Sequence, residues 1–171
     1  MTSLIKLILI NFSTSAMLLG FLLAFLCIIK TNKKDTTRVA VSEALIKYQM
    51  LMTIGVSGIY FFLLYGLFPE KVAQHVDWPA SPFQFFVAAA NLGIGVIGIF
   101  GYWEKYGFRL AVTLMASCFY LGAAAVHLFQ IFQMPTQGFA NSGSMFYMDL
   151  AIPFILIVLL RVRYLNKGDK K

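Results

Sequence analysis

Five polar side chains lie inside strongly apolar stretches of this 171-residue sequence. They are Gln84, Asn91, His127, Gln130 and Asp149. An acid and an imidazole can exchange a proton, and amides can hydrogen-bond the polar atoms of a ligand. Inside a membrane such groups are costly and normally face the interior of a helix bundle. We therefore treat these five residues as candidate ligand-binding residues, and no catalytic residue can be assigned.

Their positions along the chain predict two polar levels. Counting about 1.5 Å of rise per residue from the charged end of each span, Asn91 lies roughly 20 Å and Asp149 roughly 18 Å along its helix. By the same count Gln84, His127 and Gln130 lie roughly 27 to 31 Å from the charged ends of their spans. A buried carboxylate at such depth is protonated or paired, and His127 is the deep cationic candidate. We expect Asn91 to face Asp149, with His127 and Gln84 in the next layer.

A structural interpretation of the same residues stays open. Asn and Gln side chains often bridge membrane helices without binding anything, and each then contributes typically under about 1 kcal/mol. Asp149 could instead cap the start of a helix, and His127 could be a histidine satisfied by its neighbours.

Membrane-spanning helices are the elements expected to position these residues. The chain is 60% hydrophobic and 12% charged, whereas roughly a quarter of the residues in soluble domains are charged. Five apolar stretches approach the length of about 20 residues that a membrane helix needs. We expect one all-α membrane domain over residues 1–171, a bundle with a short interfacial helix at 69–76. The predicted spans are about 4–29, 50–68, 83–103, 110–133 and 145–160.

Basic residues predict the orientation of this bundle. They cluster after the first span, between the third and fourth spans, and after the fifth. Positive residues favour the cytoplasmic side, so we expect the N-terminus outside and the C-terminus in the cytoplasm of a cell membrane. The same placement explains the net charge of +7 through topology and anionic lipids, and nucleic acid is not an expected partner.

Local signals suggest where individual elements begin and end. The segment Asp35-Thr36-Thr37 resembles an N-cap, so we expect the second helix to start near Thr37, and Glu43 precedes Lys47 by one turn, a spacing that supports a helix. The segment "PTQGFANSGS" (135–144) reads as an outer loop. Pro153 leaves the carbonyl of Asp149 without its helical donor and predicts a kink.

Four glycines lie along the inner half of the third span: Gly93, Gly95, Gly98 and Gly101. Small residues let membrane helices approach closely, so these are candidate packing positions, within the bundle or between subunits. No strand precedes them, which excludes a phosphate-binding loop. The two cysteines show no metal-ligand spacing, and neither a metal nor another cofactor is expected.

Short motifs carry a resemblance. They are "VDWPASPFQ" (76–84) followed by Asn91, "GAAAVHLFQ" (122–130), and "NSGSMFYMD" (141–149) followed by Pro153. Together they resemble a family of small polytopic membrane proteins of unknown function, over about residues 72–160. The resemblance implies an acid where this chain has Phe86, so any chemistry of that acid would be lost or altered here. A looser likeness to DoxX-type proteins concerns architecture only.

Three functions remain open. The polar residues could bind or transport a small solute, ion or lipid-like molecule in the outer half of the membrane. The glycine-rich span could make the protein an assembly subunit, as a homo-oligomer or in a larger membrane complex. Asp149 and His127 could serve a membrane enzyme or quinone-linked redox subunit, although the sequence carries no haem-ligand pair or nucleophile motif.

Overall fold

The computed structural model describes residues 3–31, 37–75, 79, 81–133 and 138–168. Within these ranges the chain forms helices and no strand. Five helices are long and apolar enough to cross a membrane: Phe12–Lys30, Arg38–Leu67, Phe83–Phe100, Tyr106–Gln133 and Met145–Leu165. The prediction of an all-α bundle with five spans is therefore confirmed.

The first apolar stretch forms two helices instead of the single one expected over 4–29. Helix α1 (Ser3–Ile10) and helix α2 (Phe12–Lys30) meet at Asn11. The side-chain nitrogen of Asn11 donates a hydrogen bond to the carbonyl of Leu7 at 3.0 Å. The backbone amide of Asn11 donates to the same carbonyl at 3.1 Å, so side chain and backbone share one acceptor, a local bond of the kind that makes asparagine unfavourable inside helices.

The second span begins where its N-cap predicts. The hydroxyl oxygen of Thr37 accepts a hydrogen bond from the Ala40 amide at 3.2 Å, which opens helix α3 (Arg38–Gln49). The helix continues through a π-helical segment, η1 (Met50–Val56), into α4 (Ser57–Leu67). Its apolar part was predicted to start at residue 50, and the helix itself extends twelve residues further toward the N-terminus.

A buried amide fixes α2 against this long helix. Gln49 is fully buried, donates to the carbonyl of Met17 at 3.2 Å, and accepts a hydrogen bond from the Thr53 hydroxyl. Gly20 provides the space, because a Cβ there would lie 3.0 Å from the Gln49 side-chain nitrogen. The polar atoms of Gln49 are thus satisfied inside an apolar environment.

Glycines bring η1 and α4 into backbone contact with α6 (Phe83–Phe100). A Cβ on Gly58 would lie 2.6 Å from the Cα of Gly95, and a Cβ on Gly98 would lie 2.5 Å from the Gly55 nitrogen. Gly101 is less crowded, with Met50 at 3.3 Å from such a Cβ. Gly93 takes no part in the contact, since a Cβ there would meet nothing within 4 Å.

The last two long helices form a second pair. Helix α7 (Tyr106–Gln133) packs along α8 (Gly138–Gly168), whereas α6 and α7 touch at only a few points. The predicted loop over 135–144 is wrong for residues 138–144, which are helical, and 135–137 lie outside the described residues. Glycine costs about 1 kcal/mol relative to alanine inside a helix, and serine and asparagine cost less, so local propensity opposes this helix and did not decide the segment.

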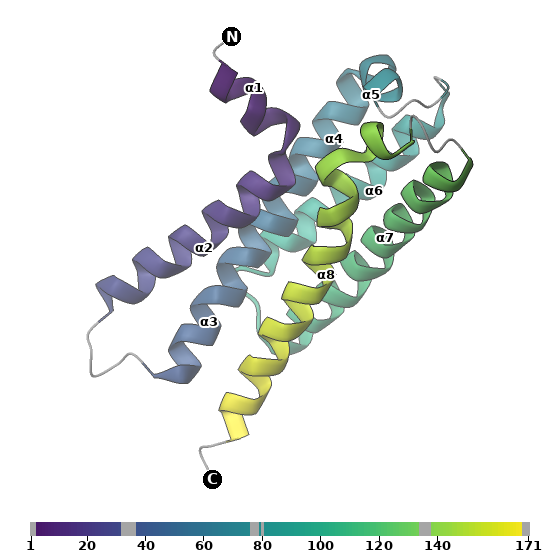
Figure 1. Ribbon diagram of the computed structural model, residues 1–171. Helices are drawn as coiled ribbons and strands as arrows, with labels where there is room; N and C mark the ends of the chain where they lie inside the picture. Colours follow the sequence, from purple (N-terminus) through teal and green to yellow (C-terminus); the bar gives the residue numbers. More distant parts are fainter. Residues whose placement is uncertain (1–2, 32–36, 76–78, 80, 134–137, 169–171) are drawn as a thin grey trace.

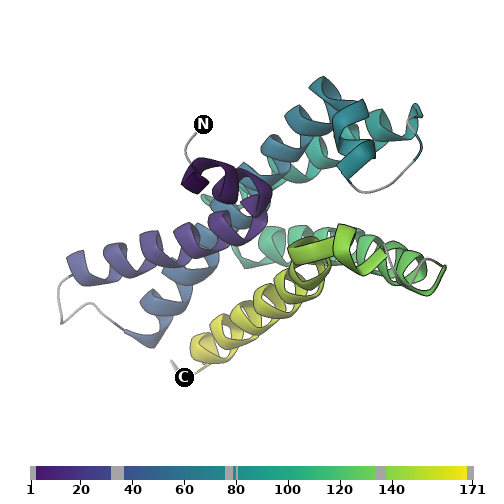
Figure 2. The same cartoon turned by 45° about the horizontal axis from the view of Figure 1, so that its top comes forward.

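Figure 1 labels the helices, and Figure 2 shows that they form two arms that diverge from a common base. One arm contains α4, α6 and the short helix α5 (Pro69–His75), which was predicted over 69–76. The other arm contains α7 and α8. Where the arms meet, side chains from α3, η1, α6, α7 and α8 form the core: Ile46, Met50, Ile54, Ile94, Val112, Ala116, Ile152 and Leu156.

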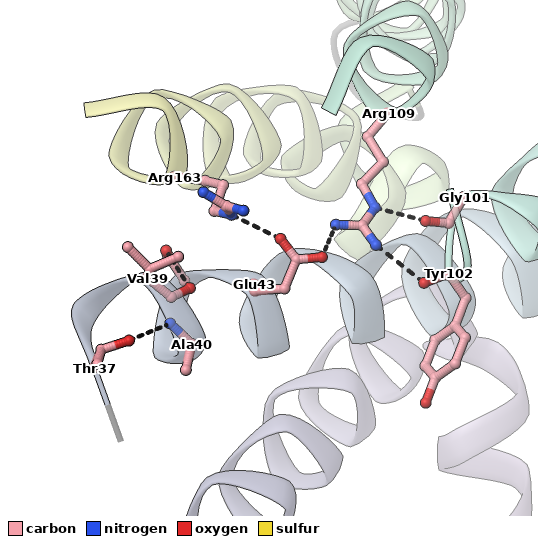
Figure 3. A network of polar contacts seen from close by, with 9 residues as sticks. Thr37, Val39, Ala40, Glu43, Gly101, Tyr102, Arg109 and Arg163 are labelled. Atoms are coloured by element: carbon pink, nitrogen blue, oxygen red, sulfur yellow. Dashed lines mark hydrogen bonds and ion pairs between the residues drawn. The ribbon is translucent and has the colours of Figure 1, made fainter. Parts of the chain in front are cut away.

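Charged side chains tie the base of the arms together (Figure 3). Glu43 of α3 binds Arg109 of α7 at 2.5 Å and Arg163 of α8 at 2.6 Å. Arg109 also donates to the carbonyls of Gly101 and Tyr102, at 2.7 and 3.0 Å, at the end of α6. Glu43 of α3 thus contacts α7 and α8 directly, and Arg109 extends these contacts to the turn after α6.

Lys47 does not pair with Glu43, although the sequence places it one turn away. Its ammonium nitrogen lies 5.2 Å from the ring centre of Tyr48 and 5.0 Å from that of Tyr102. Glu43 is instead held by two guanidinium groups, which offer planar, multiple donors that an ammonium lacks.

Candidate functional site

An open cleft lies between the two arms, at the opposite end from the Glu43 contacts. Its volume is about 380 Å³, within the range of roughly 300–1,000 Å³ that is usual for small-molecule sites. Helices α4, α6, α7 and α8 all contribute to its lining. The cleft follows from the packing, because α6 contacts α4 closely and α7 contacts α8, but α6 and α7 touch little.

The acid and the imidazole predicted from the sequence meet in this cleft. The Nε2 atom of His127 lies 3.8 Å from a carboxylate oxygen of Asp149. This distance is too long for a hydrogen bond but close enough for an ion pair when the histidine is protonated. Their side chains are 9% and 14% exposed, so both are shielded and both still open to the cleft.

Asn91 lines the same cleft but does not hydrogen-bond Asp149. Its side-chain nitrogen donates to the carbonyl of Val87 at 2.8 Å, one turn back on α6. Asn91 is 4% exposed. The expected direct contact between Asn91 and Asp149 is replaced by a shared cavity, with Asp149 nearest to His127 instead.

The two glutamines lie outside the lining of the cleft. Gln84 is buried and accepts a hydrogen bond from the Ser81 amide at 3.0 Å, while its nitrogen donates to the Pro79 carbonyl at 3.3 Å. It therefore organises the turn that leads into α6. Gln130 is half-buried on α7 and contacts the His127 side chain from one turn away.

Phe86 occupies the position where the resembling family is expected to carry an acid. Its side chain is 72% exposed, and it does not contribute to the cleft. An acid at this position would therefore lie on the outer surface of α6, so its replacement leaves the cleft unchanged.

Aromatic rings form much of the cleft wall, which the sequence reasoning missed. Phe61 and Tyr65 come from α4, Phe83 from α6, and Phe119 and Tyr120 from α7. Both tyrosines lie within electrostatic range of Asp149. A signal was available on α6, where Phe83, Val87 and Asn91 follow each other at four-residue spacing and so share one face.

The lining of the cleft suits the binding of a small organic molecule. Among the residues that the structure describes, no three His, Cys, Asp or Glu side chains converge as metal ligands. A single acid and a single imidazole sit instead in a mostly apolar lining. Such a site can orient a polar group of a ligand whose remaining atoms contact the rings.

A family model described as "Family of unknown function (DUF6790)" matches residues 10–169. The chain belongs to this family. The expected resemblance to a family of unknown function is therefore confirmed, and the DUF6790 match covers every helix that lines the cleft. Comparison with curated proteins and with solved structures found no match for the chain.

Proposed function

We propose that this multi-pass membrane protein binds a small molecule with an apolar body and a polar head group in the cleft between its arms. The observation that carries the proposal is the His127–Asp149 pair at 3.8 Å, inside an aromatic cavity of about 380 Å³. The rings and aliphatic side chains favour the apolar body, and the pair with Asn91 favours hydrogen bonds to the head group.

We further propose that the cleft opens in the outer half of the membrane. The end of α2, the start of α3, the turn between α6 and α7 and the C-terminal part of α8 lie toward the base of the bundle. They carry Lys30, Arg38, Lys105 and Arg161, and the positive-inside rule assigns such an end to the cytoplasm. The cleft is lined by the later part of α7 and by Met145 and Asp149 of α8, and these helix segments lie at the other end, toward α5. Ligand would then enter from the outer leaflet or from outside.

The internal glycine contact favours this function over an assembly role. The space beside Gly95 and Gly98, where a side chain would lie, is occupied by the backbone of Gly58 and Gly55 of the same chain. These glycines of α6 therefore pack against helices of the same molecule, and this face of α6 is not free to bind a partner subunit.

A photoactivatable long-chain alcohol in proteoliposomes tests the proposal. We expect labelling of α6 and α7 peptides at the cleft that excess unlabelled alcohol competes away. Gly122→Leu should reduce it, because Gly122 lines the cleft and has no neighbour within 4 Å of a Cβ. Gly107→Leu is the matched control, on the same helix, equally open and outside the cleft. Labelling spread over all lipid-facing helices, unaffected by Gly122→Leu, would overturn the proposal.

A further inference from the structure

We infer that the ligand of the cleft is a lipophilic organic cation, an inference that rests on the proposed binding function and names its substrate class. The cleft combines one carboxylate, Asp149, with a wall of five aromatic rings. Carboxylates attract cations directly, and aromatic faces attract them through the ring quadrupole. No lysine or arginine contributes to the described lining.

The position of Asp149 makes its charge available to a ligand. Its nearest cationic partner, His127 Nε2, lies at 3.8 Å, beyond hydrogen-bonding distance. A carboxylate removed from water is stabilised by an opposite charge within about 4–6 Å. The carboxylate remains 14% exposed, so a cation entering the cleft can approach it.

The aromatic rings select the kind of cation. Tyr65 of α4 and Tyr120 of α7 come from opposite arms, and both lie within electrostatic range of Asp149. Phe61, Phe83 and Phe119 complete the wall. Weakly hydrated cations with apolar substituents fit such a site, because their body gains apolar contact and their charge needs little water. A hydrophilic metal ion makes no apolar contact with the rings and would have to give up strongly bound water.

Anionic and neutral ligands fit the same cleft less well. A carboxylate or sulfate head group would stand beside Asp149, and like charges that share a desolvated site repel each other. A neutral head group could hydrogen-bond Asn91 or His127, but it gains no attraction from the charge of Asp149. Among ligands of the same shape, we therefore expect the cation to bind more tightly than the anion or the neutral molecule.

Two probes of matched shape and opposite charge test the inference: tetraphenylphosphonium and tetraphenylborate. We expect saturable binding of the cation to the full-length protein in detergent, tighter than the anion by about tenfold or more. Asp149→Asn keeps the size of the side chain and removes its charge, so most of the preference should disappear. Gly122→Leu should weaken binding of the cation, and Gly107→Leu should not.

The outcomes separate this inference from the proposed function. Equal affinity for the two probes, or a cation preference that survives in a folded Asp149→Asn variant, would overturn the cation assignment. So would absence of saturable phosphonium binding, even if the photoactivatable alcohol still labels the cleft, in which case the binding function stands. The probe comparison on the unaltered protein needs no variant, so it decides the question even if Asp149→Asn fails to fold.

Discussion

At the scale of single residues, Glu43 carries the contacts at the base of the bundle. Arg109 is buried, with a side chain that is 4% exposed, while Glu43 is 37% exposed. Removing one partner of a fully buried pair costs about 3–5 kcal/mol, because the other charge is left without compensation. The partial exposure of Glu43 reduces this cost through solvent screening.

We therefore expect Glu43→Gln to lower the free energy of unfolding by roughly 1–3 kcal/mol. Thermal unfolding of both proteins in one detergent measures the effect. Glu104→Gln serves as the control, because Glu104 lies exposed at the end of α6 and should change little. Equal melting temperatures for the two variants would contradict the role of Glu43.

A second residue-scale prediction concerns the pH dependence of cation binding. Among the described residues, the titratable groups that line the cleft with Asp149 are Cys118, Tyr120 and His127 of α7 and Tyr65 of α4. Protonating Asp149 removes the attraction for a cation, and protonating His127 adds repulsion, so both changes act in the same direction. Phosphonium affinity should fall as pH is lowered across roughly 8 to 5, the interval in which histidine normally changes charge.

Equilibrium binding of tetraphenylphosphonium at several pH values measures this dependence. Asp149→Asn should flatten it, since only the histidine contribution remains. Affinity that rises as the pH is lowered would show that the carboxylate does not face the bound cation.

At the scale of helices, the contact between α4 and α6 depends on glycine at particular positions. Gly95→Ala would place a Cβ 2.7 Å from the backbone nitrogen of Ile59, and backbone cannot move aside as a flexible side chain can. Overpacking of this kind typically costs about 1–3 kcal/mol. Gly93→Ala, on the same helix with open space around it, should be neutral or stabilising by up to about 1 kcal/mol.

Thermal unfolding of the two alanine variants tests whether the effect of a substitution depends on the packing around the glycine. A melting temperature reduced in Gly95→Ala but not in Gly93→Ala supports the internal contact. Loss of an oligomer with unchanged monomer stability would instead place Gly95 between subunits.

The individual helices could be predicted from the sequence, whereas the contacts between them could not. Helical spacing and hydropathy are local properties, and they predicted the five spans, the start near Thr37 and the small residues on α6. The distance between residues of different helices depends on tilt and packing, which spacing does not contain. Asn91 and Asp149 were placed at one level, yet Asp149 lies nearest to His127. Likewise, nothing local to Glu43 indicates Arg163, 120 residues away.

At the scale of the whole molecule, the charge distribution predicts which side of the membrane each end faces. In a protein without Cys27 and Cys118, Glu70→Cys on α5 should react with a membrane-impermeant maleimide in intact cells. Lys105→Cys, between α6 and α7, should react only after the membrane is permeabilised. Both native side chains are exposed, so accessibility in the protein is matched. The reverse pattern would invert the orientation.

The double contact of Glu43 also bears on how the protein is made. Its partners Arg109 and Arg163 follow it by 66 and 120 residues, and a chain emerges from the ribosome N-terminal end first. Glu43 therefore meets its first arginine after three spans have been synthesised and its second only when the final helix is nearly complete. A nascent chain that stops before Arg163 therefore leaves Glu43 with only the first of its two arginine partners.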